Sequence, residues 1–108
     1  MVQVNTSREP QKYGVAPTGT MAFVEQIARL PRLKIQGLMT IGPLVDDEAR
    51  VRQSFADLRE LRDRVLKNFV GVNNIHMQFL SMGMTDDYAI ALEEGSNMVR
   101  IGRAIFSE

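Results

Sequence analysis

The feature that most constrains this chain is a regular alternation of short apolar segments with longer amphipathic ones. Residues 2–5 alternate valine with polar side chains, residues 33–41 are apolar at most positions, and residues 77–82 and 98–101 are two further short apolar runs. Runs of this length are typical of strands, and segments with helical spacing separate them. The predicted order is βαβαβαβ, and strands joined through helices form a parallel sheet with right-handed crossovers.

The longest helical pattern follows Asp46 and Asp47. Either carboxylate can accept hydrogen bonds from the free amides at a helix N-terminus, and negative charge is favourable there. Apolar residues then recur every three or four positions, namely Val51, Phe55, Leu58, Leu61, Val65 and Phe69. This stripe predicts one long helix that packs a single face against the sheet.

Two shorter helices are predicted on either side of the long one. The first has Thr18 and Thr20 as N-cap candidates, and Pro31 ends it. Its apolar stripe contains Phe23, Ile27 and Leu30. The other helix opens at residues 85–87 and closes at Gly95.

Four parallel strands and three helices make an α/β fold that is half of a (β/α)8 barrel. A complete barrel typically needs about 250 residues, whereas this chain has 108, of which 44% are hydrophobic. We therefore expect one domain over residues 1–108, with one modest core. Four strands would leave two open edges and an apolar face, so we expect a homo-oligomer or association with the missing half-barrel.

Composition argues against several classes of function. Thirteen basic residues balance thirteen acidic ones, so no net charge attracts nucleic acid or an anionic membrane. The chain has no cysteine and a single histidine, which argues against disulfides, thiolate nucleophiles and metal sites. No apolar run approaches the roughly 20 residues that span a bilayer, and no secretory signal pattern is present. We expect a soluble cytoplasmic protein.

Functional groups of parallel α/β folds lie at the C-terminal ends of the strands. Three segments qualify here: the loop after Asn5, residues 81–85 and residues 100–103. His76 precedes its predicted strand and therefore lies at the opposite end, where a structural or solvent-exposed histidine is the simpler interpretation.

Gly83 and Gly102 would let backbone N–H groups approach an anion, and Ser81 and Thr85 could add hydroxyl donors. Glycine and serine at strand ends usually serve turn geometry, so spacing alone favours that interpretation over phosphate binding. Arg100 is a permanently charged residue inside an apolar run. It needs an acceptor if it points into a barrel, and a ligand or an internal ion pair would each provide one.

Two segments, LSMGMTDD at 80–87 and GSNMVRIGRAIF at 95–106, resemble signature stretches of the pyridoxal phosphate homeostasis protein family. Residues 2–6, 12–14 and 37–40 resemble that family too. The resemblance covers essentially the whole chain. It implies the C-terminal half of a single barrel that is similar to the N-terminal domain of alanine racemases and binds pyridoxal 5′-phosphate (PLP).

The resemblance also implies roles for individual residues. It places on the phosphate side of PLP the residues Ser81, Gly83, Met84, Gly102 and Arg103. Arg100 matches the arginine that faces the pyridine nitrogen. Because a guanidinium does not release its proton, that nitrogen tends to stay unprotonated and PLP becomes a poorer electron sink.

Some residues depart from the related patterns. Arg103 stands where the family often has a small hydroxyl residue, and Ile41 replaces a histidine that alanine racemases use. The Schiff-base lysine of the family belongs to the missing half, and none of Lys12, Lys34 and Lys67 matches it. The resemblance therefore implies non-covalent PLP binding without enzymatic activity in this chain. Two alternatives stay open: part of a PLP-dependent racemase-like enzyme completed by another chain, and a self-associating structural half-barrel.

Overall fold

The computed structural model describes residues 1–7, 14–43, 47–84 and 87–100. The elements in chain order are β1 (Val2–Gln3), the 3-10 helix η1 (Pro17–Gly19), α1 (Thr20–Ala28), β2 (Ile35–Met39), α2 (Glu48–Asn68), β3 (Ile75–Met84), α3 (Tyr88–Glu93) and β4 (Met98–Arg100). The predicted alternation of four strands with three α-helices is confirmed. No helix within these ranges is long and apolar enough to cross a membrane.

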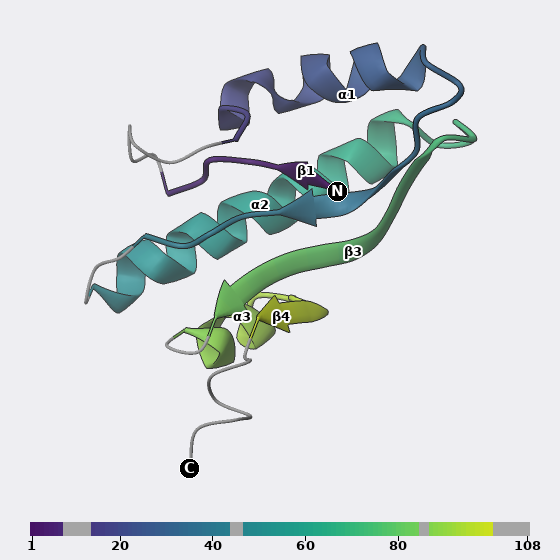
Figure 1. Cartoon of the computed structure of the whole chain (residues 1–108). Helices are drawn as coiled ribbons and strands as arrows, with labels where there is room; N and C mark the ends of the chain where they lie inside the picture. Colours follow the sequence, from purple (N-terminus) through teal and green to yellow (C-terminus); the bar gives the residue numbers. More distant parts are fainter. Residues whose placement is uncertain (8–13, 44–46, 85–86, 101–108) are drawn as a thin grey trace.

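The four strands form one sheet in the order β1-β2-β3-β4, and every neighbouring pair is parallel (Figure 1). In this sheet Leu38 lies between Val2 and Leu80, whereas Met39 lies between Gln3 and Ser81. Because all the strands run in one direction, their C-terminal ends lie at the same edge of the sheet. This edge is called the C-terminal edge below.

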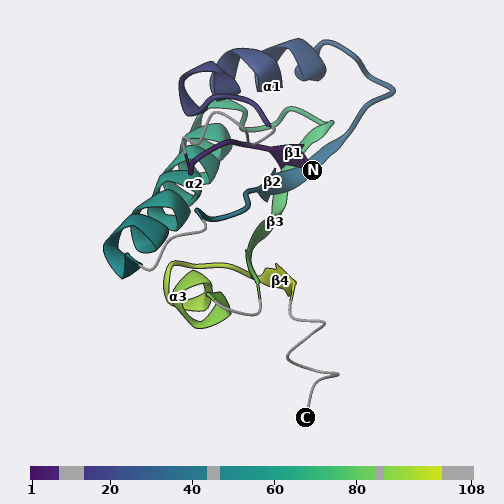
Figure 2. The ribbon, with the colours of Figure 1, turned by 60° about the vertical axis from the view of Figure 1, so that its left-hand side comes forward.

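The core lies between one face of the sheet and the helices (Figure 2). Alternate strand residues supply its sheet side, as shown by the full burial of Leu38 and Leu80. The predicted stripe of α2 supplies the other side, with five buried residues: Val51, Phe55, Leu58, Leu61 and Val65. The helical spacing of apolar residues in the sequence therefore predicted which face of α2 contacts the core.

A second row of residues crosses the other face of the sheet, away from the core. Strand pairing aligns Gln3, Met39, Ser81 and Met98 in this row. The corresponding face of a closed (β/α)8 barrel lines its interior. Ser81 therefore lies on the face where barrel proteins place their interior side chains.

The start of α1 differs from the sequence prediction. The N-cap is Gly19, and no side chain caps the helix, so both Thr18 and Thr20 were wrong as caps. Thr20 is instead a buried residue of the first turn, and its hydroxyl donates to the carbonyl of Ala16 at 3.1 Å. The preceding 3-10 turn leads the chain directly into the helix, which leaves no extended cap position for a threonine.

The end of α1 is joined to a distant part of the chain. The helix ends at Ala28, before Pro31, and the predicted stripe residue Leu30 is 48% exposed because it lies beyond the helix. The side-chain amide of Asn74 lies 3.1 Å from each of three carbonyl oxygens, those of Ile27, Leu30 and Leu33. The carbonyls of Ile27 and Leu30 also accept the backbone amides of Leu30 and Leu33, so Asn74 adds a second donor to the last turn.

The start of α2 agrees with the sequence prediction. The carboxylate of Asp47 accepts hydrogen bonds from the amides of Ala49 at 3.0 Å and Arg50 at 3.4 Å. Asp47 is therefore the N-cap. The other candidate, Asp46, lies outside the described residues.

Strand β3 is longer than predicted, spanning Ile75–Met84 rather than 77–82. Met84 pairs with Arg100 of β4, so the sheet continues past the expected end. His76 is consequently the second residue of the strand rather than a residue before it. Its ring nitrogen Nε2 lies 2.8 Å from the carbonyl of Asn73, at the edge opposite the C-terminal edge, as expected.

The expectation of two open sheet edges is wrong at β1. Val15 forms a parallel bridge with Val4 on the outer side of this strand. The Val15 amide donates to the Gln3 carbonyl at 2.8 Å, and the Asn5 amide donates to the Val15 carbonyl at 2.8 Å. The loop after β1 thus folds back and satisfies backbone groups that would otherwise be free to pair with another strand.

Candidate functional site

The structure places several predicted site residues together at the C-terminal edge. Ser81, Gly83 and Met84 form the end of β3, and pairing sets Arg100 of β4 beside Met84. They therefore belong to the strand rather than to the loop that the sequence indicated. Three further predicted residues lie outside the described part of the chain, namely Thr85, Gly102 and Arg103, and the side chain of Arg100 is not described either.

Ser81 is a buried polar residue with an unused hydroxyl. Only 3% of it is exposed, and its carbonyl accepts a hydrogen bond from the Thr40 amide at 3.0 Å. Within the described ranges its hydroxyl has no hydrogen-bond partner. A buried hydroxyl without a partner is costly, so this position is suited to a polar ligand group.

Gly83 adopts a backbone conformation that favours glycine, with φ +101°. A Cβ at this position would lie 2.6 Å from the Cβ of Ala91 and 3.3 Å from the Cα of Tyr88. Helix α3 therefore packs directly on the end of β3. Close packing of α3 explains this glycine by itself, in addition to any approach by a ligand.

The backbone amide of Met84 already has an anionic partner. It donates to Oδ1 of Asp87, the N-cap residue of α3, at 2.6 Å. The predicted opening of α3 by acidic residues is therefore only partly right, because this carboxylate bonds backward to β3 and caps no amide of the helix. A phosphate could use the Met84 amide only if the Asp87 side chain moved away.

Two buried threonines at the same edge were not singled out as site residues from the sequence. The Thr40 hydroxyl donates to the Val4 carbonyl at 2.7 Å and lies 2.8 Å from the hydroxyl of Thr6. Both are almost fully buried, at 4% and 3% exposure. The available signal was a hydroxyl residue just after each of two apolar strands. Together with Ser81, they make the C-terminal edge polar where it meets the core.

The described lysines lie away from this edge. Lys34 directly precedes β2, and Lys67 lies in the last turn of α2, so both are at the opposite edge of the sheet. Lys12 is outside the described residues. In the described ranges, no group of three or more histidine, cysteine, aspartate or glutamate residues could hold a metal ion.

A pocket of about 460 Å³ lies at the opposite edge, between the end of α2 and the start of β3. Phe69, Val70 and His76 contribute to its wall. Because it is far along β3 from Ser81, it is not part of the site at the C-terminal edge.

Comparison with known proteins identifies the family. A family model described as "Alanine racemase, N-terminal domain" matches residues 1–108. The chain belongs to this family. Within it, the pyridoxal phosphate homeostasis protein of Aquifex aeolicus is 40% identical over 108 residues, which are 100% of this chain and 46% of that protein. The predicted resemblance to the homeostasis proteins is confirmed, and the chain spans about half the length of the curated relatives it matches.

Solved structures agree with this family assignment. A crystal structure of an unknown protein from Bifidobacterium adolescentis is 41% identical, with a TM-score of 0.88 over 98% of this chain and 42% of that one. PipY of Synechococcus elongatus, solved with PLP bound, is 27% identical, with a TM-score of 0.78 over 98% of this chain and 47% of PipY. The fold is therefore part of the (β/α)8 barrel of this family.

The site at the C-terminal edge fits the phosphate of PLP in two respects and opposes it in one. The hydroxyl of Ser81, which has no partner among the described residues, is a suitable donor, and the backbone of Gly83 lies at the same strand end. Asp87, by contrast, places a carboxylate on the Met84 amide. The residues present therefore fit a phosphate whose main contact is the Ser81 hydroxyl.

Proposed function

We propose that this chain binds PLP non-covalently, as the C-terminal half of a barrel of the homeostasis type. The observation that carries the proposal is the buried hydroxyl of Ser81, which has no hydrogen-bond partner in the described ranges. A phosphate oxygen would supply that partner, and hydrogen bonds to charged groups are stronger than neutral ones. The relative PipY, which was solved with PLP bound, supports the choice of ligand.

The proposed arrangement gives each residue a simple task. Ser81 and Thr85 donate hydroxyl hydrogen bonds to the phosphate, and the backbone at Gly83, Gly102 and Arg103 adds amide donors. The Met84 amide becomes a further donor once the Asp87 carboxylate moves away from it. Arg100 faces the pyridine nitrogen and keeps it unprotonated. PLP itself supplies an electron sink for reactions of amino acids, and the guanidinium of Arg100 would weaken that sink.

The chain is proposed to lack catalytic activity alone. Neither described lysine lies at the C-terminal edge, so the proposed role of this chain is to hold PLP rather than to turn over a substrate. The names of the curated relatives, which refer to PLP homeostasis, support this proposal. A cytoplasmic location remains a prediction, which cell fractionation would test.

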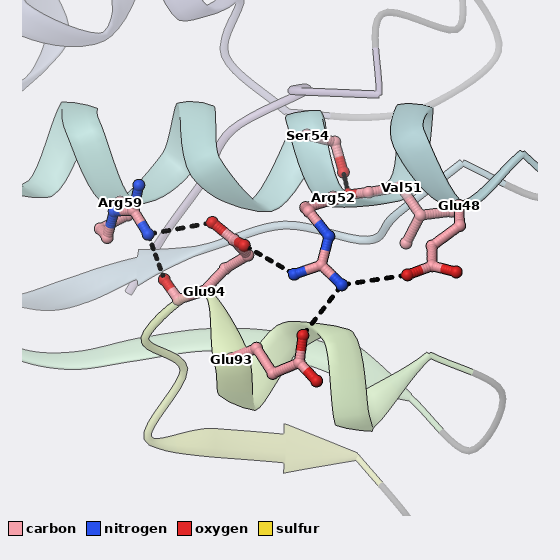
Figure 3. Close-up of polar contacts among 7 residues, drawn as sticks. All are labelled: Glu48, Val51, Arg52, Ser54, Arg59, Glu93 and Glu94. Atoms are coloured by element: carbon pink, nitrogen blue, oxygen red, sulfur yellow. Dashed lines mark hydrogen bonds and ion pairs between the residues drawn. The ribbon is translucent and has the colours of Figure 1, made fainter.

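A titration with PLP tests the proposal, with Ser81→Ala as the variant and Ser54→Ala as its matched control. Both serines are buried, at 3% and 2% exposure, but the Ser54 hydroxyl is already bonded to the Val51 carbonyl at 2.9 Å (Figure 3). Loss of a hydrogen bond to a charged phosphate costs about 1.5–3 kcal/mol, so Ser81→Ala should weaken binding about tenfold or more. Ser54→Ala should leave the affinity unchanged.

Unfolding measurements on the same variants make the test sharper. Ser54→Ala should lower the free energy of unfolding by about 1 kcal/mol because it removes a satisfied hydrogen bond. Ser81→Ala should leave the stability of the free protein equal or higher, since it removes an unsatisfied group. Equal PLP affinity in wild type and Ser81→Ala would contradict the proposal, as would borohydride fixing PLP stoichiometrically on one lysine.

The alternative of a racemase-like enzyme has one observation in its favour, the description of the matching family model. An amino-acid racemisation assay, with a chain supplying the first half-barrel added back, distinguishes the two. Turnover in the mixture would favour the enzyme, and PLP binding without turnover would favour the homeostasis role.

We also propose that the sheet face bearing Met39 and Met98 is covered by association, either with a second copy or with the missing half-barrel. Val15 already pairs with the outer side of β1. The open face of the sheet, rather than the β1 edge, is therefore the surface proposed for this contact. Sedimentation should show an assembly larger than a monomer. A well-folded monomer at all concentrations would exclude self-association.

A further inference from the structure

A cluster of ion pairs joins the end of α3 to the middle of α2, and Glu94 is at its centre (Figure 3). One carboxylate oxygen of Glu94 lies 2.9 Å from Nη1 of Arg59, and the other lies 2.9 Å from Nη1 of Arg52. Arg59 also donates to the backbone carbonyl of Glu94 at 3.3 Å. The Glu94 side chain is only 14% exposed, so it is the most enclosed carboxylate of the cluster.

Arg52 extends the cluster to two more carboxylates. Its Nη2 lies 3.0 Å from Glu48 on α2 and 2.9 Å from Glu93 on α3. The pKa of Arg52 is raised above its ordinary value, chiefly by the hydrogen bond to Glu94 and then by those to Glu48 and Glu93. Three of these contacts cross between the helices, two from Arg52 and one from Arg59, so the cluster sets the distance between α2 and α3.

Helix α3 needs such an anchor because it has only six residues. A helix of this length is not stable alone in water, so its position depends on tertiary contacts. Its buried anchor on the sheet side is Ala91, which packs against Gly83. Its N-terminal contact is the bond from the Met84 amide to Asp87.

The two ends of α3 therefore have different partners. Glu94, at the C-cap, is held by arginines of α2, and Asp87, at the N-cap, holds the amide of Met84 in β3. A shift of the helix would change the packing on Gly83 and the geometry at Met84 together. These are two of the residues assigned to the phosphate of PLP.

We propose that Glu94 is a positioning residue, which acts through α3 to hold Gly83 and Met84 in the backbone conformation that the phosphate site uses. Glu94 lies at the far end of α3 from Asp87 and touches no ligand in this scheme. Its role in binding rests on the proposed function, whereas its effect on the backbone can be measured without any ligand.

The test uses Glu94→Gln, which keeps the shape of the side chain and removes its charge, with Glu25→Gln as the matched control. Glu25 pairs with Arg29 on a single helix, with side chains 60% and 76% exposed, so its loss should have no effect at the site. The first readout is the hydrogen-exchange rate of the Met84 amide in the free protein. The second is the affinity for PLP, with inorganic phosphate as a probe of the phosphate contacts alone.

Glu94→Gln should speed exchange at Met84 and weaken binding of both PLP and phosphate by about fivefold each, as expected for two partly exposed ion pairs. The amide of Val4, bonded to the Met39 carbonyl at 2.8 Å and away from α3, should keep its rate. A general loss of stability would instead speed both amides equally. Adding Arg59→Gln to Glu94→Gln should cause little further loss of affinity for PLP, because the ion pair between residues 59 and 94 is already broken.

The outcomes separate the two proposals. Unchanged exchange at Met84 in Glu94→Gln, or equal acceleration at Met84 and Val4, would overturn the positioning role. A wild-type chain that binds neither PLP nor phosphate would overturn the proposed function, while exchange at Met84 would still report on Glu94. Normal PLP binding by Glu94→Gln, together with normal exchange, would leave the proposed function intact and remove only the positioning role.

Discussion

Replacing Gly83 by alanine tests the contact between α3 and the end of β3. Two effects should destabilise this variant. A non-glycine residue at φ +101° is strained, which costs about 1–3 kcal/mol. The new methyl would also lie 2.6 Å from the Cβ of Ala91, an overlap of the kind that costs about 1–3 kcal/mol in a packed core. The free energy of unfolding should therefore fall by about 2–6 kcal/mol.

Gly71→Ala is the matched control for this experiment. Gly71 has φ +80°, but a Cβ there would meet no atom within 4 Å, so only the conformational cost applies. Urea denaturation should show the Gly83 variant to be less stable than the Gly71 variant by about 1–3 kcal/mol, with similar slopes of free energy against urea.

Equal losses in the two variants would refute the packing of α3 on Gly83. A third variant checks the contact directly, because Ala91→Gly removes the atom that the new methyl would meet. When Ala91→Gly is added to Gly83→Ala, the free energy of unfolding should rise. The double variant should then be more stable than the sum of the two single losses predicts. Additive losses would show that the two residues do not touch.

Three further predictions, one of them with a control variant, follow from the structure and are measured by urea denaturation. Phe55→Ala should lower the free energy of unfolding by about 3–5 kcal/mol, since Phe55 is fully buried; a loss below about 1 kcal/mol would contradict its place in the core. Asp47→Ala should cost about 1 kcal/mol through loss of the N-cap, whereas Asp63→Ala, which breaks only a surface pair with Arg62, should cost less than about 0.5 kcal/mol. Asn74→Ala should cost about 1–2 kcal/mol and speed amide exchange near the end of α1; unchanged exchange there would exclude its capping role.

Much of the fold could be predicted because it depends on neighbouring residues. The stripe of α2 and its cap at Asp47 are encoded within consecutive turns of one helix. The order of strands and helices follows from local changes of hydrophobic period, and their parallel arrangement follows from the crossovers. The family could also be predicted, because its motifs are contiguous segments around Ser81 and Arg100.

Boundaries were harder to predict where a distant element decides them. The end of α1 is bonded by Asn74, which lies 47 positions from Ile27, and β3 continues beyond residue 82, where Met84 pairs with Arg100 of β4. Val15 satisfies the edge of β1 from the far side of a loop. None of these partners can be identified from the residues next to the boundary.

The sequence by itself determined the element order, the apolar faces and the family, because periodicity and motifs are properties of contiguous residues. Only the tertiary structure decided that the Ser81 hydroxyl is buried with no partner among the described residues, that Ala91 lies on Gly83, and that Glu94 reaches two arginines of α2. Arg59 and Glu94 are 35 positions apart. Contacts over such distances arise when elements dock, and docking is set by the shape of the whole core rather than by any local segment.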